Sequence, residues 1–382
     1  MTRILHVVTD YPDGVNKVYT KAVKNLLEVT KGELSHHVIS IVRKSGFKFD
    51  VIRQSDNLIV LVVPKVKLAI PNLLIMRLAY SKLVHALGHD YFKNFDFIHA
   101  HKLTIDGVLG WVIAKLNQRK LVVSVRGSTD VKWVNGDIIG RHIYRKVFNY
   151  STHNFWISAW AKKVIIKMLK INNENLSDTL LPNICREDFN NKIVVNHSTK
   201  KFVFVGRLDS KDSKGLLKVI KAVSAISNAK MDVYGSFSAE QLTYLDSYIL
   251  GFNAKDRVSV LGRINNDELK IKLPEYAALL MPSNPETFGI SYVEALAKNI
   301  PILGSKFSGI SGYLENKSYI ALVDEKKEQE ISACINTFLV KQQQIKNELY
   351  NDISEGVLDF LSDEGIKKHY VKQSQRIAIN AH

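Results

Sequence analysis

Cysteine is scarce in this chain of 382 residues, which has only two. Cys185 and Cys334 lie far apart and form neither a Cys-x-x-Cys pair nor a Cys/His ligand spacing, which argues against a disulfide framework and a structural zinc site. Long hydrophobic runs are also absent: no stretch of about eighteen uncharged apolar residues occurs, so no transmembrane helix is expected. The N-terminal apolar run is too short for a signal peptide. These absences predict a cytosolic protein.

Acidic residues are under-represented in the first half of the chain. Residues 1–190 contain 28 Lys and Arg against 15 Asp and Glu, a net charge of +13, whereas residues 191–382 contain 25 against 22, a net charge of +3. Such an excess attracts nucleic acid, anionic lipid or phosphorylated ligands, or only keeps the protein soluble. Because no RNP, helix-turn-helix or zinc-finger pattern is present and the cations are scattered, a nucleic-acid-binding protein is the weaker interpretation.

Short apolar runs alternate with longer helical patterns along the whole chain, which is typical of parallel sheets covered by helices on both faces. The strands expected in the first half are residues 3–9, 34–42, 58–63, 97–101, 120–125, 155–158 and 179–181. Those expected in the second half are residues 202–205, 231–234, 258–261, 278–281, 301–304 and 319–323. Helical patterns between them include residues 15–29 and 107–116. The sequence therefore predicts an α/β protein with two doubly wound domains.

A polar stretch at residues 184–200 marks the expected domain boundary, because it follows a strand and precedes the first strand of the second half. We expect one domain at residues 1–190 and another at residues 191–364. The final segment is helical in pattern and basic, and the sequence leaves open whether residues 365–382 pack back on the first domain.

Two carboxylates eight positions apart, Glu286 and Glu294, flank the start of a predicted helix within MPSNPETFGISYVEALAKNIPILGS. Thr287 is a suitable N-cap for this helix. The free backbone N–H groups at its positive end, which would face an anion, are those of Phe288, Gly289 and Ile290. Both carboxylates can face one crevice and accept hydrogen bonds from sugar hydroxyls. The alternative is that Glu286 only interacts with the helix dipole and Glu294 only lies on a solvated face.

A second loop, VGRLDSKDSKG, follows the first strand of the second half. Gly206 permits a tight turn, Arg207 offers a planar set of donors, and Lys214 places a compact cation before the next helix. Two cations beside a helix N-terminus suit a diphosphate. The alternative, that these are ordinary loop charges, stays open at this point.

The segments GRLDSKDSKG, VLGRINNDEL and MPSNPETFGISYVEALAKNIPILGS resemble the retaining GT-B glycosyltransferases of glycosyltransferase family 4, also described as glycosyl transferases group 1. That family combines a G-R-x(n)-K-G loop with two acids in an E-x7-E arrangement, which Glu286 and Glu294 match. The resemblance covers most of residues 200–312, and LLPNICREDF is similar to the family's interdomain linker. It implies two Rossmann-like domains that face a central cleft, with the acceptor on the first and the nucleotide sugar on the second.

The resemblance also implies roles for the matched residues. Arg207 and Lys214 would hold the donor diphosphate and, with Glu286 on the hydroxyls of the transferred sugar, form the catalytic group. The remaining donor contacts would come from Glu294 on the ribose, the amides of Phe288, Gly289 and Ile290 on the distal phosphate, and Gly206, Gly262 and Arg263 around the nucleotide. No metal ion and no cofactor besides the donor would be required, which agrees with the absence of a D-x-D triplet. Family frequency favours UDP as the nucleotide.

The first half departs from the family pattern in two loops. Only Gly14 stands where many relatives have two glycines, and Arg126 stands where many have a histidine. An arginine can contact sugar or phosphate but cannot act as a general base. His101 and Asp130 are further candidates for the cleft, although a histidine at a strand end is more often structural. These departures keep open the alternative of a catalytically idle subunit with this fold.

Residues 64–88 combine Leu, Ile and Met with four cations, Lys65, Lys67, Arg77 and Lys82. The segment is either a helix that lies on an anionic membrane or a core-packing helix with ordinary surface lysines. With the basic first half, it favours peripheral docking at the inner face of the cytoplasmic membrane. The sequence as a whole predicts a hexosyltransferase that acts on a glycan or lipid-linked acceptor in bacterial polysaccharide, lipopolysaccharide or capsule biosynthesis.

Overall fold

The computed structural model describes residues 1–16, 19–172, 176–187, 189, 198–314 and 316–379. The chain forms two compact units: Met1–Ile184 together with Asp363–His382, and Cys185–Ser362. The boundary between them lies at 184/185 and not at 190/191. Most of the stretch expected to mark it, residues 188 and 190–197, lies outside the described residues.

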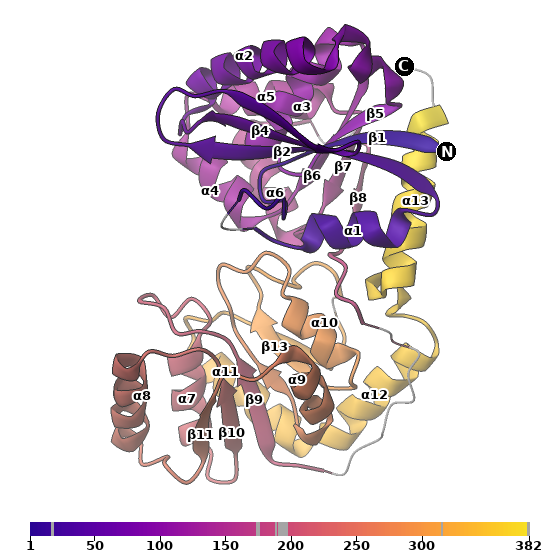
Figure 1. The fold of residues 1–382 in the computed structure, drawn as a ribbon. Helices are drawn as coiled ribbons and strands as arrows, with labels where there is room; N and C mark the ends of the chain where they lie inside the picture. The colour runs from indigo at the N-terminus through magenta and orange to yellow at the C-terminus, as the bar shows by residue number, and fades with distance from the viewer. Residues whose placement is uncertain (17–18, 173–175, 188, 190–197, 315, 380–382) are drawn as a thin grey trace. The chain divides into compact units, whose positions relative to one another are not determined.

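The first unit is built on an eight-stranded sheet in the order β3-β4-β2-β1-β5-β6-β7-β8 (Figure 1). Its strands are β1 (Thr2–Val8), β2 (Leu34–Lys44), β3 (Asp50–Ser55), β4 (Leu58–Pro64), β5 (Phe97–Ala100), β6 (Lys120–Val125), β7 (His153–Trp156) and β8 (Asp178–Leu180). β3 runs antiparallel to β4, while β1 is parallel to both of its neighbours, β2 and β5. The chain order reverses between β1 and β5, and ligands bind outside the carboxyl ends of strands at such a switch point.

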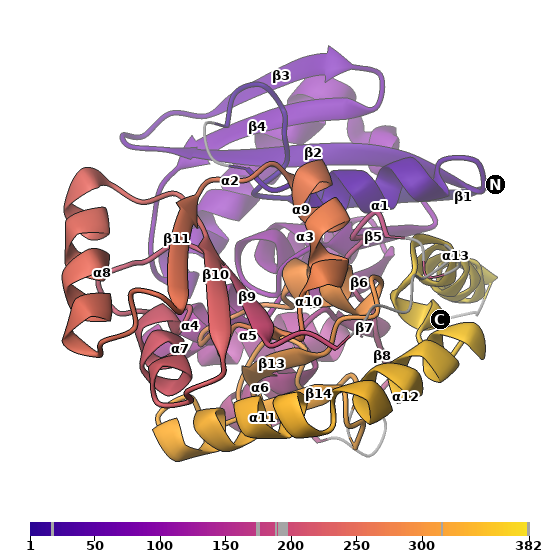
Figure 2. The same cartoon turned by 90° about the horizontal axis from the view of Figure 1, so that it is seen from below.

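Helices cover both faces of this sheet, which explains why its central strands are continuous apolar runs. They are α1 (Ala22–Thr30), α2 (Ala69–Leu87), η1 (His89–Asn94), α3 (Ile105–Leu116), α4 (Ser128–Gly136), α5 (Arg141–Tyr150), α6 (Ala159–Leu169) and α13 (Asp363–Ile379). α2, α3 and α5 pack together on one face, and α1 packs against α13 on the other (Figures 1 and 2).

The C-terminal helix α13 belongs to the first unit, a point that the sequence left open. The Tyr370 hydroxyl lies 2.8 Å from Nδ1 of His99 on β5, and Lys120 Nζ donates to the Ile377 carbonyl at 2.7 Å. Both contacts are buried, so they tie the end of the chain to the first sheet.

The second unit has a six-stranded sheet in the order β11-β10-β9-β12-β13-β14. Its strands are β9 (Lys201–Val205), β10 (Lys230–Tyr234), β11 (Val258–Gly262), β12 (Leu279–Leu280), β13 (Ile302–Ser305) and β14 (Ile320–Val323). Its helices are α7 (Leu216–Ser224), α8 (Ala239–Gly251), α9 (Asn266–Lys272), η2 (Leu273–Glu275), α10 (Ile290–Leu296), α11 (Glu328–Val340), α12 (Gln342–Ser354) and η3 (Asp359–Leu361). All of its neighbouring strands are parallel, and the switch point lies between β9 and β12.

Every strand expected from the sequence is present, which confirms an α/β protein with two doubly wound sheets. The helix expected at residues 15–29 is wrong at its start, because α1 begins at Ala22. The Asp13 carboxylate accepts hydrogen bonds from the amides of Val15 (2.8 Å) and Asn16 (2.7 Å) and so holds residues 13–16 as a loop.

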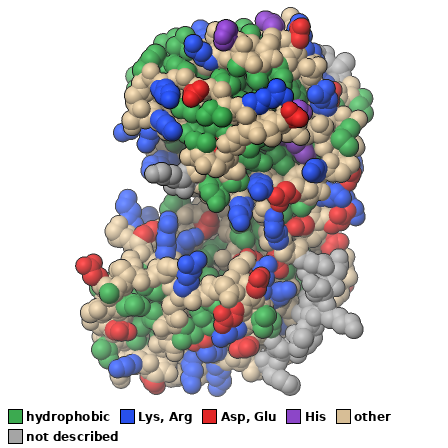
Figure 3. Space-filling view, viewed as in Figure 1, with side chains coloured by type: hydrophobic (Ala, Val, Ile, Leu, Met, Phe, Trp, Pro, Cys, Tyr) green, Lys and Arg blue, Asp and Glu red, His purple; other side chains and the backbone are tan. Residues whose placement is uncertain are grey.

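Two features of the folded chain concern its hydropathy and its charge. Among the described residues, no helix combines the length and apolar character needed to cross a membrane. Lys and Arg side chains are spread over the displayed face of both units and do not gather in one patch (Figure 3).

Candidate functional site

The candidate site lies at the carboxyl ends of β9 and β12, at the switch point of the second sheet. Gly206 and Gly235 directly follow β9 and β10, and Gly262 is the last residue of β11. The Gly206 amide donates to the Tyr234 carbonyl at 2.9 Å, and the Gly235 amide donates to the Gly262 carbonyl at 2.9 Å. A Cβ atom on Gly235 would lie 2.0 Å from the Gly206 carbonyl oxygen, so only glycine allows the two strand ends to approach in this way.

The loop after β9 packs directly on the loop after β12. The Asn284 amide donates to the Ser213 carbonyl at 2.8 Å. Gly215, the N-cap of α7, has φ = 76°, and a Cβ there would lie 2.8 Å from Cγ of Pro282. The close contact between Gly215 and Pro282 therefore brings together the two segments that carry the family resemblance.

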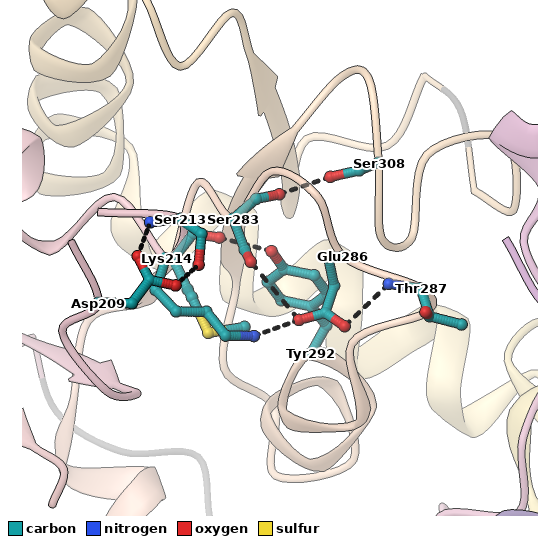
Figure 4. A network of polar contacts seen from close by, with 9 residues as sticks. Asp209, Ser213, Lys214, Ser283, Glu286, Thr287, Tyr292 and Ser308 are labelled. Atoms are coloured by element: carbon teal, nitrogen blue, oxygen red, sulfur yellow. Dashed lines mark hydrogen bonds and ion pairs between the residues drawn. The ribbon is translucent and has the colours of Figure 1, made fainter. Parts of the chain in front are cut away.

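Lys214 and Glu286, one from each loop, form an ion pair between Nζ and Oε2 (Figure 4). The Thr287 amide donates to Oε1 of Glu286 at 2.9 Å, which orients the carboxylate. The side chains of Lys214 and Glu286 keep 24% and 17% of their exposure, so a ligand can reach both. A cation and a carboxylate held side by side can bind a phosphate and an adjacent hydroxyl of the same molecule.

The loop after β9 has its own internal support. Asp209 accepts hydrogen bonds from the amides of Lys211 (3.2 Å) and Ser213 (2.9 Å) and from the Ser213 hydroxyl. The hydrogen bonds from Ser213 lower the pKa of Asp209, so this carboxylate stays ionised. Arg207 is exposed, and its side chain makes no hydrogen bond or ion pair with the residues that the structure describes.

The expected N-cap at Thr287 is wrong. α10 begins at Ile290, and its N-cap is Gly289, whose φ of 86° interrupts the helix. The Tyr292 ring occupies the space beside Gly289, since a Cβ there would lie 2.2 Å from Cδ2 of that ring. Phe288 is buried at 1% exposure. Of the three predicted amide donors, only Ile290 therefore lies in the helix, while those of Phe288 and Gly289 belong to the preceding loop.

Tyr292 is a supporting residue that the sequence did not reveal. Its hydroxyl donates to the Met281 carbonyl, and Figure 4 shows its ring beneath Glu286. Burial raises the pKa of Tyr292, and the nearby Glu286 charge adds to this effect. The tyrosine thus stays neutral and fixes α10 against the strand end.

Glu294 lies on α10 and is buried at 5% exposure. Asn266 Nδ2 donates to its Oε1 at 3.1 Å. Burial raises the pKa of Glu294, with a smaller contribution from Glu187, while Lys270 opposes the change. Glu286 and Glu294 therefore have different partners, Lys214 and Asn266.

Gly262 and Arg263 lie at the end of β11. Gly262 has φ = 76° and open space where a side chain would stand, and Arg263 is exposed. Asn266, which the sequence interpretation passed over, follows three residues after Arg263 as the first residue of α9. A polar residue at the start of the helix that follows a strand-end glycine is the signal that could have identified it.

The first-unit candidates are mostly engaged in internal contacts. Asp130, at 0% exposure, accepts hydrogen bonds from the amides of Leu103 (3.0 Å) and Arg126 (2.8 Å) and so joins the loops after β5 and β6. The Arg126 guanidinium donates to Asn183 at 2.7 Å. Gly14 has φ = 76° with open space around it.

His101 belongs to a buried histidine cluster, in which the ligand atoms of His6, His99 and His101 lie within 4.8 Å of one another. Among the described residues, this is the group whose chemistry could hold a metal ion. However, His6 Nδ1 lies 2.9 Å from His101 Nε2, and both ring nitrogens of His99 are bonded, to Tyr370 and Ser124. Only Nδ1 of His101 lacks a partner, so a metal ion would have to displace hydrogen bonds that are already made.

Residues 186–359 match the family model described as glycosyl transferases group 1. The chain is 22% identical over 275 residues to the uncharacterized glycosyltransferase YqgM of Bacillus subtilis, covering 70% of this chain and 74% of YqgM. It is 27% identical over 175 residues to the O-antigen chain mannosyltransferase RfbU of Salmonella typhimurium, covering 46% of this chain and 48% of RfbU. HepE of Anabaena, solved in complex with UDP, matches with a TM-score of 0.68 at 15% identity, over 98% of this chain and 100% of HepE.

Proposed function

Because residues 186–359 match the glycosyl transferases group 1 model and the chain has the GT-B fold of its structural neighbours, we propose that it is a glycosyltransferase. It transfers a hexose from a nucleotide diphosphate donor, with UDP as the favoured nucleotide, to a glycan or lipid-linked acceptor. RfbU is named as an O-antigen mannosyltransferase and another relative, CapH of Staphylococcus aureus, as a capsular polysaccharide biosynthesis glycosyltransferase. The proposed pathway is therefore bacterial surface polysaccharide synthesis.

The contact between Lys214 and Glu286 carries the proposal. These residues are 72 positions apart, yet their side chains form an ion pair at the carboxyl edge of the sheet. We assign the donor diphosphate to Lys214 and the exposed Arg207, and the hydroxyls of the transferred sugar to Glu286. Glu294 binds the ribose, and the Ile290 amide with the loop amides before it contacts the distal phosphate.

The mechanism follows from where charge develops. As the bond to the sugar breaks, negative charge grows on the departing diphosphate, and Arg207 and Lys214 stabilise it without a metal ion. The leaving group departs on the face that the acceptor enters, so the configuration at the sugar is retained. A phosphate oxygen of the leaving group takes the acceptor proton, and we assign no side chain as nucleophile or base.

Turnover with a panel of nucleotide sugars tests this function. With membrane and glycan extracts as acceptors, the purified protein should release free nucleotide from one donor of the panel. Glu286→Gln should reduce that release by about a hundredfold or more, as the loss of a transition-state contact does. Glu240→Gln, an exposed carboxylate on α8, is the matched control and should retain full activity. If the protein releases nucleotide from no donor of the panel, the proposed activity is contradicted and the chain is a catalytically idle protein of the same fold.

We also propose that α2 rests on an anionic membrane. The helix packs its inner side on α3, yet its outer side exposes Ile70 (45%), Leu74 (57%) and Leu78 (49%). Ile138 and Ile139, 71% and 76% exposed, lie beside its first turn because Asp137 accepts a hydrogen bond from the Ala69 amide at 2.6 Å.

The charge of this segment supports the same contact. Residues 57–89 contain no Asp or Glu but include Lys65, Lys67, Arg77 and Lys82. Each cation near an anionic surface adds about 1 kcal/mol of attraction. Exposed leucines and isoleucines beside unopposed cations are what an interfacial helix requires.

A further inference from the structure

A cavity of about 650 Å³ opens in the first unit, at the carboxyl ends of β1, β2, β4 and β5. This is the switch point of the first sheet, where ligands of open α/β sheets bind. Its polar and aromatic lining includes Asp10, Arg43, Lys44, Lys65, Lys102 and Trp133. The volume lies within the range of about 300–1,000 Å³ that is usual for small-molecule sites.

The lining of this cavity is strongly basic. Four cationic side chains, from Arg43, Lys44, Lys65 and Lys102, stand against the single carboxylate of Asp10. Lys102 pairs with Asp10 and donates to the Thr9 hydroxyl at 2.9 Å. That leaves Lys44 and Lys65 without a carboxylate partner in the lining, while the charge of Arg43 interacts with the buried carboxylate of Asp106.

Lys44 and Lys65 are the two cations open to a ligand, and Arg43 is half-buried. Lys44 and Lys65 are exposed and adjacent, since the Lys65 amide donates to the Lys44 carbonyl at 2.8 Å. Within the described part of the chain, neither side chain makes a hydrogen bond or ion pair. Arg43 lies over the Trp133 ring at 5.1 Å and donates one N–H to the Val66 carbonyl, while its buried Nε has no partner.

The backbone amides of Val15 and Asn16 in the cavity lining are not free to bind an anion. The loop at Gly14 directs the amides of Val15 and Asn16 to the Asp13 carboxylate, and the Ser40 hydroxyl also donates to this group. Asp13 is buried at 3% exposure, so its carboxylate interacts with these donors and does not face the cavity solvent. Lys44 and Lys65 are the exposed cations of the lining that an anion in this cavity can contact.

We propose that this cavity binds the acceptor of the transfer reaction through a phosphate or diphosphate group, held by Arg43, Lys44 and Lys65. The lysines offer mobile charge to the phosphate, and the terminal N–H groups of Arg43 that are not bonded to Val66 add a further donor. Asp10, beside Lys102, accepts a hydrogen bond from a hydroxyl of the attached sugar. This inference rests on the proposed function and assigns an acidic, phosphorylated acceptor to it. A soluble sugar phosphate and a polyprenyl phosphate share this chemistry.

Calorimetric titration of the full chain tests the assignment. The probes are glucose 6-phosphate, glucose, and phosphatidylcholine vesicles with and without a polyprenyl phosphate. The variant pair is Lys44→Gln with Lys65→Gln, and the control pair is Lys163→Gln with Lys167→Gln, which removes the same charge from the exposed side of α6. All proteins also carry Lys214→Gln, so that phosphate bound at the donor site does not contribute.

A loss of about tenfold or more in affinity for a phosphorylated probe in the first pair, with the control pair unchanged, is the expected result. The probe that binds, sugar phosphate or polyprenyl phosphate, identifies the source of the phosphate. Equal losses in both pairs, binding of glucose as tight as that of its phosphate, or no binding of any probe would overturn the proposal. Nucleotide release from a donor by protein with Lys214 intact separates this failure from a failure of the proposed function.

Discussion

A chain of buried histidines makes the first unit sensitive to acid. The Thr30 hydroxyl lies 2.9 Å from His36 Nε2, His36 Nδ1 lies 2.9 Å from His6 Nε2, and His6 Nδ1 lies 2.9 Å from His101 Nε2. Burial, with the neighbouring histidines, lowers the pKa of both His6 and His101 well below the ordinary value. The folded protein therefore keeps these rings neutral under conditions in which the unfolded chain binds protons.

The loss of stability can be worked out for three histidines of the first unit, His36, His99 and His153. Burial lowers the pKa of His36 to about 4, of His99 to about 3 and of His153 to about 4. Unfolded histidine titrates near pH 6.5, so between pH 7 and pH 5 each of the three costs about 2 kcal/mol of stability. The sign follows from linkage: the unfolded state binds more protons, so stability is present above pH 6.5 and falls with pH below it. The three together amount to about 6 kcal/mol, which is comparable with the whole stability of many domains.

Tryptophan fluorescence during guanidinium unfolding measures the stability of the first structural unit. All four tryptophans belong to the first unit: Trp111, Trp133, Trp156 and Trp160. The free energy of unfolding should fall by several kcal/mol from pH 7 to pH 5. His36→Gln should reduce that difference by about 2 kcal/mol, because one buried group no longer titrates.

His142→Gln is the matched control. This histidine is exposed on α5, so its replacement should leave the pH dependence unchanged. Equal free energies of unfolding at pH 7 and pH 5, or the same pH dependence in His36→Gln as in the natural protein, would refute the reasoning.

Three further outcomes are expected. Gly235→Ala should destabilise the second unit by about 2–3 kcal/mol in denaturant titrations, because its Cβ would lie 2.0 Å from a carbonyl oxygen. The control Gly251→Ala, whose Cβ would meet no atom within 4 Å, should leave the stability unchanged. Asp130→Ala should lower the stability of the first unit by about 2 kcal/mol or more, because two buried amides lose their acceptor; unchanged tryptophan unfolding would contradict this. Leu74→Glu should abolish co-sedimentation with anionic vesicles, and retained binding would exclude α2 as the membrane contact.

Most of the fold could be predicted because parallel sheets bury both faces, which leaves continuous apolar runs in the sequence. The strand that was missed, β3, is an antiparallel edge strand, and four of its six residues are exposed. Its sequence, DVIRQS, lacks such a run. The start of α1 was misplaced since one buried carboxylate, Asp13, holds the preceding residues as a loop, and such a contact has no periodicity.

The candidate site of the second unit was predictable in its residues but not in its local geometry. Spacing in the sequence identified Lys214 and Glu286, and the structure brings them together. The left-handed backbone of Gly289, which moves the N-cap from Thr287 to Gly289, depends on the packing of the Tyr292 ring. The basic cavity of the first unit could not be read from the sequence, because its cations come from separate strand ends that only the sheet order makes neighbours.

The central claim is that Lys214 and its partners hold the diphosphate of a nucleotide. Calorimetric titration of UDP and other nucleoside diphosphates into the natural protein, Lys214→Gln and the exposed α8 control Glu240→Gln tests it most directly. We predict that one nucleoside diphosphate binds to the natural protein and to the control, and that Lys214→Gln weakens this binding by about tenfold or more. Binding that is unaffected by Lys214→Gln, or absent for every nucleoside diphosphate, would contradict the account.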